Sequence, residues 1–374
     1  MNPTLSLALF AALSALSFNL VAAEQGDAYA QRELGTIQKV AELYSKAGAG
    51  DAAAQTSLGY MYIGGQGVVK DEAEAARWYR KAAEQGDAKA QSALGRMYAE
   101  GRGVAKDDVE AVKWFRKAAD QGNANAQSAL GRMYAEGRGV VKDDVEAVQW
   151  NLLAAEQGNA YAQNSLGRMY AEGRGVVKDE TEAARWYRKA ADQGGAYAQS
   201  VLGRMYVEGR GVVKDEAEAA KWYLLAAEQG DAYAQSALGR MYAEGRGVVK
   251  DETEAARWYR KAAEQGGTYA QSALGRMYVG GRGVVKDDVE AVQWNLLAAE
   301  RGHAAAQSTL GRMYAEGRGV VKDEAEAMKW YLLAAGQGDA YAQSALGRMY
   351  AEGRGVVKDE AEAVKWYRKA AVKA

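Results

Sequence analysis

The feature that most constrains this 374-residue chain is the strict spacing of its tryptophans. All 9 of them recur at 36-residue intervals, from Trp78 to Trp366. Glycines beginning at Gly59 and Met-Tyr pairs beginning at Met61 keep the same interval. A fixed period of roughly 20–50 residues is typical of a solenoid in which each repeat packs only against its neighbours. Length alone would favour two or three globular domains, but the period predicts a single array of nine repeats over residues 51–374.

The repeat over residues 87–122 predicts a helix hairpin. Asp87 is a good N-cap for a first helix over residues 88–100. Gly101 can adopt the left-handed conformation that ends such a helix. After a short turn, a second helix is expected to run to Gly122. The fold class predicted from the 36-residue period is therefore all-α.

Local patterns within this repeat predict its caps and its core. Asp107 and Glu110 have the spacing of a capping box, in which each side chain accepts a hydrogen bond from the other residue's amide. Helical periodicity places Leu94 on the core face of the first helix and Trp114 on the facing stripe of the second. Gly95 allows close approach of the two helices, and Trp114 is expected to fill the remaining volume. Because one hairpin cannot bury all this apolar surface, stacking on neighbouring repeats should complete the core.

The composition excludes several kinds of chemistry. The chain has no Cys, which excludes disulfides, thiolate metal ligands and cysteine nucleophiles. Its one histidine, His303, occupies the cap position where sister repeats carry Asp or Asn, so we interpret it as a cap and expect no metal site. The turn sequence GRGV lacks the strand and the Lys-Ser or Lys-Thr of a phosphate-binding loop, and no cofactor is expected. A net charge of −1 favours neither nucleic acid nor anionic lipid as a partner.

The first 23 residues predict a secretory signal peptide. They carry no charged side chain, contain an apolar stretch over residues 5–20 and end in small residues at Ala22 and Ala23. We expect cleavage after Ala23 and a periplasmic or secreted protein without stable membrane insertion, because no later segment is long and apolar enough to span a bilayer. The stretch lacks a preceding Lys or Arg, so an uncleaved or interfacial helix is the alternative.

Residues 24–50 are interpreted as a degenerate leading repeat that caps the array. Residues 27–35 match the first helix of a repeat, and residues 40–47 match the second. Gly35 and Gly59 are 24 residues apart, which is 12 fewer than the standard interval. The turn between the two helices is therefore missing from this repeat.

The recurring pattern AxAQxxLGxMYxxGxGVxKDxxEAxxWYxxAAxxG resembles the Sel1-like repeat, a relative of the tetratricopeptide repeat. The resemblance implies a right-handed superhelical α-solenoid of the bacterial exported type. It also implies a non-enzymatic scaffold or adaptor that binds a protein or peptide. Some exported relatives are rich in cysteine and are linked to β-lactam binding or hydrolysis, which the absence of Cys puts in doubt here. A binder of cell-envelope glycan, or an enzyme directed at β-lactams or peptidoglycan, remains the alternative.

The variable positions predict where a partner would bind. The family resemblance implies that the first helices line a concave surface, where tyrosine and arginine recur seven residues apart. Tyr and Arg dominate binding hot spots, so we interpret this Tyr–Arg row as a candidate partner site. In the alternatives, the Arg pairs with the Glu that most repeats carry four residues later, as Arg96 could with Glu100, or the Tyr packs between repeats. The Tyr–Arg row comprises Tyr161, Arg168, Tyr197, Arg204, Tyr233, Arg240, Tyr269, Arg276, Tyr341 and Arg348.

A second variable site lies on the second helices. Some repeats carry Arg-Lys after the Trp-containing pair, and others carry Leu-Leu. The second leucine is expected to reach the outer surface, where it could form an apolar patch for a partner or a membrane surface. Packing on a neighbouring helix is the alternative. These outer leucines are Leu153, Leu225, Leu297 and Leu333.

Overall fold

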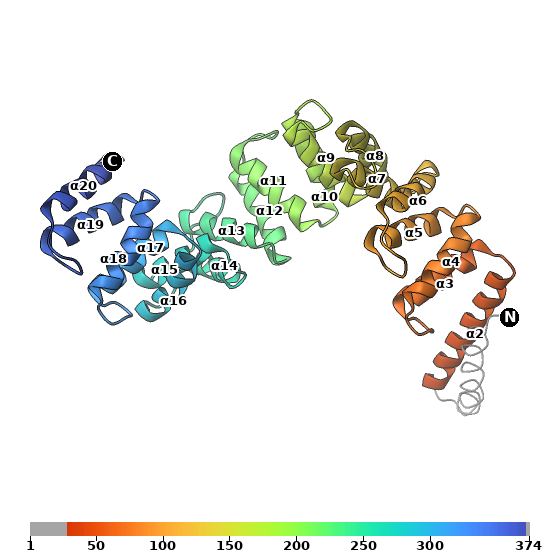
Figure 1. The fold of residues 1–374 in the computed structure, drawn as a ribbon, viewed down its shortest axis with the longest axis horizontal. Helices are drawn as coiled ribbons and strands as arrows, with labels where there is room; N and C mark the ends of the chain where they lie inside the picture. The colour runs from red at the N-terminus through yellow and green to blue at the C-terminus, as the bar shows by residue number, and fades with distance from the viewer. Residues whose placement is uncertain (1–27, 372–374) are drawn as a thin grey trace. The chain divides into compact units, whose positions relative to one another are not determined.

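The computed structural model describes residues 28–371 as helices joined by short turns, without a strand in that range (Figure 1). The helices belong to two compact units, of which the first ends at Asp179 and the second begins at Glu180. The predicted all-α solenoid of 36-residue helix hairpins is confirmed. The predicted signal peptide, residues 1–23, lies outside the described residues. None of the described helices combines the length and apolar character needed to cross a membrane.

Each repeat consists of an A helix followed by a B helix. In the first unit the A helices are α3 (Ala52–Gly64), α5 (Ala88–Glu100), α7 (Ala124–Glu136) and α9 (Ala160–Glu172), and the B helices are α4 (Glu72–Glu84), α6 (Asp108–Asp120) and α8 (Asp144–Glu156). In the second unit the A helices are α11 (Ala196–Glu208), α13 (Ala232–Glu244), α15 (Thr268–Gly280), α17 (Ala304–Glu316) and α19 (Ala340–Glu352), and the B helices are α10 (Glu180–Asp192), α12 (Glu216–Glu228), α14 (Glu252–Glu264), α16 (Asp288–Glu300), α18 (Glu324–Gly336) and α20 (Glu360–Ala371). Helix α2 (Ala28–Gly48) precedes the first repeat.

Capping residues set the helix boundaries as the sequence predicts, with one exception. The Asp87 side chain accepts from the Ala90 amide at 2.7 Å, and Gly101 ends α5 in the left-handed conformation. Asp107 accepts from the Glu110 amide at 3.0 Å. The reciprocal half of the expected capping box is wrong, because the Asp107 amide donates instead to the carbonyl of Tyr98 at 3.0 Å. This bond joins the start of the B helix to the A helix of the same repeat.

In the hairpins that lie within one unit, a B-helix side chain lies directly over an A-helix glycine. A Cβ atom at Gly95 would stand 2.8 Å from the ring of Phe115, and one at Gly239 would stand 2.9 Å from the ring of Tyr259. The expectation that Trp114 fills the space at Gly95 is therefore wrong. Adjacent residues on a helix point about 100° apart, so Phe115 faces the glycine. Trp114 packs instead against the hydrophobic cluster of α4 and α5.

The turn after each A helix contacts the B helix of the preceding repeat. The second glycine of the turn has positive φ, and at Gly103 a Cβ would lie only 2.0 Å from the carbonyl oxygen of Glu72. Glycine alone allows the two backbones to approach this closely, because it combines a left-handed conformation with the absence of a side chain. The turn glycines therefore set the spacing between successive repeats.

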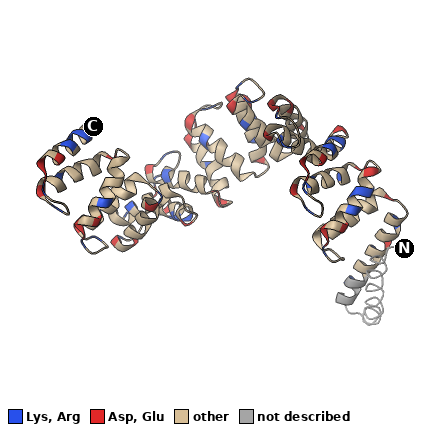
Figure 2. Cartoon of the chain, viewed as in Figure 1, with Lys and Arg blue, Asp and Glu red and all other residues tan. Residues whose placement is uncertain are grey.

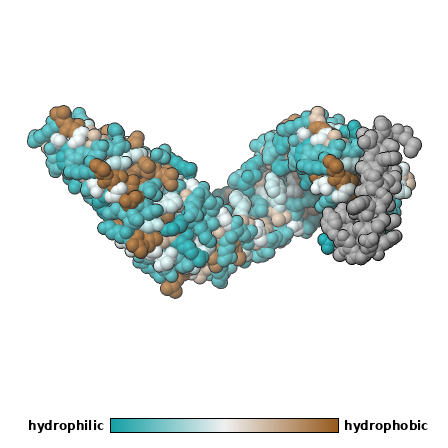
Figure 3. Space-filling view, turned by 90° about the horizontal axis from the view of Figure 1, so that it is seen from below, coloured by the Kyte–Doolittle hydropathy of each residue, from teal (hydrophilic) through white to brown (hydrophobic). Residues whose placement is uncertain are grey.

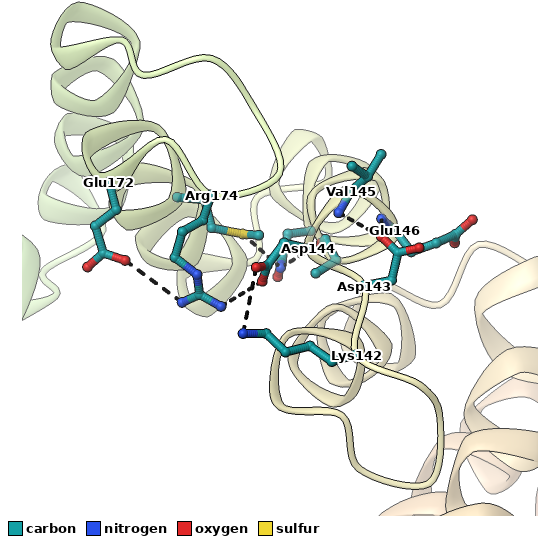
Figure 4. A network of polar contacts seen from close by, with 10 residues as sticks. Lys142, Asp143, Asp144, Val145, Glu146, Glu172 and Arg174 are labelled. Atoms are coloured by element: carbon teal, nitrogen blue, oxygen red, sulfur yellow. Dashed lines mark hydrogen bonds and ion pairs between the residues drawn. The ribbon is translucent and has the colours of Figure 1, made fainter.

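The arginine between the two turn glycines forms an ion pair across the same junction (Figure 4). Arg174 approaches Asp144, the first residue of α8, at 2.6 Å and Glu172 at 3.8 Å. Lys142 lies 3.8 Å from the same Asp144 carboxylate. Equivalent pairs join Arg102 to Glu72, Arg138 to Asp108, Arg210 to Glu180, Arg246 to Glu216, Arg318 to Asp288 and Arg354 to Glu324.

A buried glutamine connects three helices at the other end of each A helix. Gln91 is 4% exposed, and its Nε2 donates to the carbonyl of Ala83 in the preceding B helix at 3.0 Å. Its Oε1 accepts from Gln121, which ends the following B helix, at 2.8 Å. Both polar ends of a buried amide are thus satisfied, which removes the free-energy penalty of burying it.

The described part of the expected leading repeat is one continuous helix, α2. Residues 28–35 and 40–47, which resemble an A helix and a B helix, have no turn between them and therefore share this helix. The C-terminal part of α2 packs as a preceding B helix would. Ala47 is buried, and its carbonyl accepts from Gln55 Nε2 at 3.0 Å, as that of Ala83 does from Gln91.

The turn-glycine contact makes a direct stability prediction. Gly319→Ala would place a Cβ 2.0 Å from the Asp288 carbonyl oxygen at a residue with φ of +70°. We expect a loss of at least about 2 kcal/mol in unfolding free energy at this junction, from left-handed strain and the clash together. Urea denaturation followed by circular dichroism would measure it. Gly336→Ala is the matched control because nothing lies within 4 Å of its Cβ position, and equal midpoints for the two variants would contradict the prediction.

The ion pairs across the turns predict a pH dependence of stability. A hydrogen bond from Arg318 lowers the pKa of Asp288 below its usual range. Since the folded-state pKa is the lower one, the contribution is present above the unfolded value of about 3.9 and is lost as pH falls through the folded value.

We therefore expect a variant without these ion pairs to lose less unfolding free energy than the wild-type protein when the pH falls from about 5 to about 3. Urea denaturation across this pH range would measure the difference, which should be small because the pairs are partly exposed to solvent. The test variant combines Arg246→Gln, Arg318→Gln and Arg354→Gln. The control combines Lys221→Gln, Lys329→Gln and Lys365→Gln, which removes exposed pairs within single helices. An identical acid response of the two triple variants would refute the proposed role.

Candidate functional site

The predicted Tyr–Arg row lies on the solvent-facing side of the A helices. Its five tyrosines are between 41% and 55% exposed, from Tyr269 at the lower end to Tyr197 at the upper end. All five of its arginines are exposed as well. The row is divided between the units, with Tyr161 and Arg168 in the first and the other members in the second.

The exposed tyrosines also pack between successive repeats. The ring of Tyr233 lies 6.2 Å from that of Tyr223 in the preceding B helix, and Tyr341 lies 6.3 Å from Tyr331 in the same way. Burial, together with the neighbouring Tyr233, raises the pKa of Tyr223, so this hydroxyl stays protonated at neutral pH. Packing between repeats is therefore one role of these tyrosines. It holds one face of each ring and leaves the other in solvent.

The arginines of the row do not pair with the glutamates four residues later, so that alternative is wrong. Glu100, the last residue of α5, instead approaches the turn residue Arg102 at 3.5 Å. Glu244 pairs in the same way with Arg246 at 3.5 Å. The chain reverses at the glycine after each A helix, and this brings the turn arginine to the glutamate. Over residues 28–371, no acidic side chain comes within ion-pair distance of the row's arginines, which are Arg168, Arg204, Arg240, Arg276 and Arg348, or of Arg96 and Arg132 at the same position in other repeats.

The first unit contains a groove of about 740 Å³ along its A helices. Asn125 and Lys89 occupy the positions where the row has tyrosine. At Asn125 no tyrosine ring covers the preceding B helix, and Phe115 is left to line the groove. At Lys89 the ring of Tyr60 packs instead on Tyr79 of the preceding B helix, with 5.4 Å between centroids. The lining residues are Tyr60, Lys89, Ser92, Ala93, Arg96, Phe115, Asn123, Asn125, Ser128, Ala129, Arg132, Asn159 and Tyr161.

Polar contacts order one end of this groove. Asn159 Nδ2 donates to Asn125 Oδ1 at 3.2 Å, which connects α9 to α7. The Arg132 guanidinium lies over the ring of Tyr161, 5.9 Å from its centroid. Such a cation–π contact holds the guanidinium without neutralising its charge. The end of the groove near α9 is therefore positively charged and ordered before any partner binds.

The outer leucines are exposed on the B helices, where they were expected. Leu153, Leu225, Leu297 and Leu333 are between 44% and 53% exposed. In repeats with Arg-Lys at these sites the lysine covers the tryptophan, as Lys81 does at 4.3 Å from the Trp78 ring. Hydrophobic residues appear as small separate patches on the face shown in Figure 3. Acidic and basic side chains are interspersed along the helices (Figure 2).

The described residues offer no cluster of metal ligands, and the single histidine has a structural role. Residues 28–371 contain no group of three or more His, Cys, Asp or Glu side chains that could hold a metal ion. His303 caps α17, with Nδ1 accepting from the Ala306 amide at 3.3 Å. Burial, with a smaller contribution from Arg276, lowers the pKa of His303. A neutral imidazole is the form that can accept this capping hydrogen bond.

Two buried polar features were missed by the sequence analysis. The glutamine junction could have been found, because a glutamine stands at the same A-helix position in all nine repeats. Asn151 and Asn295 replace the ring that lies over the hairpin glycine, and each leaves Oδ1 buried without a hydrogen-bond partner in the described structure. The change from Trp-Tyr to Trp-Asn at these two positions was the available signal.

Comparison with known proteins gives a consistent result. The family model described as the Sel1 repeat matches residues 52–87, 88–123, 124–159, 160–195, 196–231, 232–267, 268–303, 304–339 and 340–371. Among curated protein sequences, none matches the chain.

Two solved structures are similar over most of the chain. One is a protective antigen present in uropathogenic Escherichia coli strains and displaying an SLR fold. It is 40% identical, with a TM-score of 0.84, over 95% of this chain and 79% of that one. The other is a Sel1 repeat protein from Oxalobacter formigenes, 35% identical, with a TM-score of 0.60, over 90% of this chain and 93% of that one.

The unsatisfied asparagine predicts a stabilising substitution. Asn295→Tyr would restore the ring that sister repeats place over this glycine and would remove a buried acceptor without a partner. We expect a gain of roughly 1–3 kcal/mol from the added burial and the removed penalty, measured as a higher urea midpoint. The reverse change in the next repeat, Tyr331→Asn, should lower the midpoint, and destabilisation by both variants would contradict this account.

Proposed function

Because this chain belongs to the Sel1 repeat family, we propose that it is a non-enzymatic scaffold that binds a protein or peptide partner through the Tyr–Arg row. The solenoid of Sel1 repeats is a fold commonly used for protein interaction. One observation carries the proposal. The arginines of the row are exposed and have no acidic partner among the described residues, and each accompanies a half-exposed tyrosine on the same A helix.

The energetics of association favour this surface. Tyr and Arg are the residue types most enriched at binding hot spots. Packing of one ring face against the preceding B helix orders each tyrosine in advance, as Tyr223 does for Tyr233. Less side-chain entropy is then lost when a partner covers the other face. The arginines can form charge-assisted hydrogen bonds without first breaking an ion pair.

An enzymatic role has less support. A hydrolase would need one repeat with a distinct nucleophile, base and oxyanion site. The only histidine is a helix cap, and the A and B helices repeat nearly the same residues along the array. Binding of a cell-envelope glycan, the alternative from the cysteine-rich relatives, is tested by the experiment below.

We further propose that the scaffold acts outside the cytoplasm. The support is the uncharged, apolar character of residues 1–23 and the small residues that end at Ala23. A partner would then be found among periplasmic, envelope or extracellular proteins. N-terminal sequencing of the protein from an envelope fraction would show whether the mature chain begins at Glu24.

Affinity capture from an envelope extract tests the Tyr–Arg row. The purified chain should retain a specific protein partner, and a quadruple alanine variant of the row should lose it by at least about 100-fold in affinity, since each hot spot can contribute about 2 kcal/mol. The variant combines Tyr197→Ala, Arg204→Ala, Tyr233→Ala and Arg240→Ala.

The control combines Leu225→Ser, Leu297→Ser and Leu333→Ser on the B helices, and circular dichroism verifies the fold of both variants. Unchanged partner affinity in the folded row variant would exclude the row as the site. If the leucine variant alone lost binding, the partner surface would lie on the B helices. Recovery of peptidoglycan fragments without any protein would refute the scaffold proposal.

A further inference from the structure

The groove in the first unit differs from the rest of the A-helix surface in its charge. Three cationic side chains line it, from Lys89, Arg96 and Arg132, and no acidic side chain does. Within the described residues none of the three forms an ion pair. Arg132 Nε is in addition buried without a hydrogen-bond partner. The groove therefore has cationic hydrogen-bond donors that the protein does not use itself.

The helix caps strengthen this positive potential. Asn123 and Asn159 cap α7 and α9 and line the groove, whereas Asp51 and Asp87 cap the two preceding A helices. An asparagine satisfies the free helix amides as an aspartate does, but it leaves the positive end of the helix dipole without a countercharge. The cap residues that line the groove therefore carry no carboxylate that would repel an anionic ligand.

The opening itself depends on side-chain size. In the second unit the tyrosines of the row cover the rings of the preceding B helix, as Tyr269 covers Tyr259 with 6.1 Å between centroids. Asn125 is too short to cover Phe115, which lies at the equivalent position and forms part of the floor. Aromatic surfaces from Tyr60 and Tyr161 also line the groove. Cationic groups and aromatic surfaces are both available to one ligand.

We infer that this groove binds an extended, Asp- and Glu-rich peptide segment of the partner, an inference that rests on the proposed scaffold function. Its carboxylates would pair with Lys89, Arg96 and Arg132. Asparagine side chains can both donate to and accept from a peptide backbone, and Asn125 and Asn159 line the groove on successive A helices. The lining extends from α3 to α9. Three helix-to-helix steps of about 8–10 Å give roughly 25 Å, or about eight extended residues.

Other anionic polymers fit these observations less well. Nucleic acid recognition uses many phosphate contacts along a continuous basic surface. Here only three cations line the groove, and the net charge of the chain is −1. A carboxylated glycan shares the charge of an acidic peptide but lacks its regularly spaced backbone amides, and it is included in the test.

The test measures binding of a fluorescein-labelled decapeptide that alternates Glu and Asp around one Tyr. The comparison peptide carries Gln and Asn instead. We expect the acidic peptide to bind at least 10-fold more tightly to the full chain, with an affinity that falls as salt is raised. Equal affinity for the two peptides, or no binding of either, would overturn the inference.

Three double variants test whether the peptide binds in the groove. Arg96→Gln with Arg132→Gln should weaken the acidic peptide at least 10-fold. Lys221→Gln with Lys329→Gln removes the same amount of charge from B helices of the second unit, outside both the Tyr–Arg row and the groove, and should alter affinity less than 2-fold. Lys89→Tyr with Asn125→Tyr should fill the groove with the residue that sister repeats carry, and should abolish binding while the fold persists. Equal losses in the arginine variant and the lysine control, or unchanged binding to the filled groove, would overturn the inference.

The outcomes separate this inference from the proposed function. If the filled groove still captures its envelope partner while the Tyr–Arg variant does not, the scaffold proposal stands and the acidic-peptide inference fails. If the acidic peptide binds in the groove, but the filled-groove variant and the Tyr–Arg row variant both capture the envelope protein as well as the wild-type chain does, the scaffold proposal fails. Binding of oligogalacturonate, with none of the acidic peptide, would overturn the peptide assignment.

Discussion

The contact between a B-helix ring and a bare A-helix glycine determines how the rest of each repeat is arranged. A side chain at Gly239 would collide with Tyr259, so the two helices can approach this closely only because that residue is glycine. The ring then has one edge directed toward the next A helix, where Tyr269 packs on it and remains partly exposed. The exposed tyrosine row is thus a consequence of the hairpin core. A binding surface built in this way is ordered by the same contacts that stabilise the fold.

The repeats are held together by polar contacts at both ends of the A helix, as well as by apolar packing. The buried glutamine bonds to the preceding repeat, as Gln91 does to Ala83, and to the B helix of its own repeat, as Gln91 does to Gln121, so one of its two hydrogen bonds depends on the neighbouring repeat. Two glutamines depart from this arrangement, since Gln271 and Gln343 each leave Oε1 buried without a partner in the described residues. At Gln271 the cause is Arg301, which replaces the glutamine that would donate to it. Arg301 donates instead to the carbonyl of Gly266. Neighbour-dependent satisfaction of this kind favours cooperative folding of adjacent repeats.

The sequence predicted the fold well because helix boundaries depend on local chemistry. The Asp87 cap and the Gly101 stop lie where the pattern places them. Contacts that depend on chain reversal were not predictable in this way. One alternative paired Glu100 with Arg96 along its helix, but the turn brings Arg102 to within 3.5 Å of Glu100. The candidate row could be identified from the variable residues of the sequence. The groove could not, because it exists only where the short side chain of Asn125 leaves Phe115 uncovered.

Near-identical repeats pose a problem for specificity, because a surface repeated without change would bind a partner equally well in several registers. The core and junction residues cannot resolve this, since each repeat needs them to stack. Differences at solvent-facing A-helix positions can, because they alter charge and shape without disturbing the glycine contacts. Lys89 and Asn125 interrupt the tyrosines, and the neutral caps Asn123 and Asn159 lie beside that interruption. Lys89 followed one repeat later by Asn125 occurs at no other place in the array, and so gives a means of fixing the register of a bound partner.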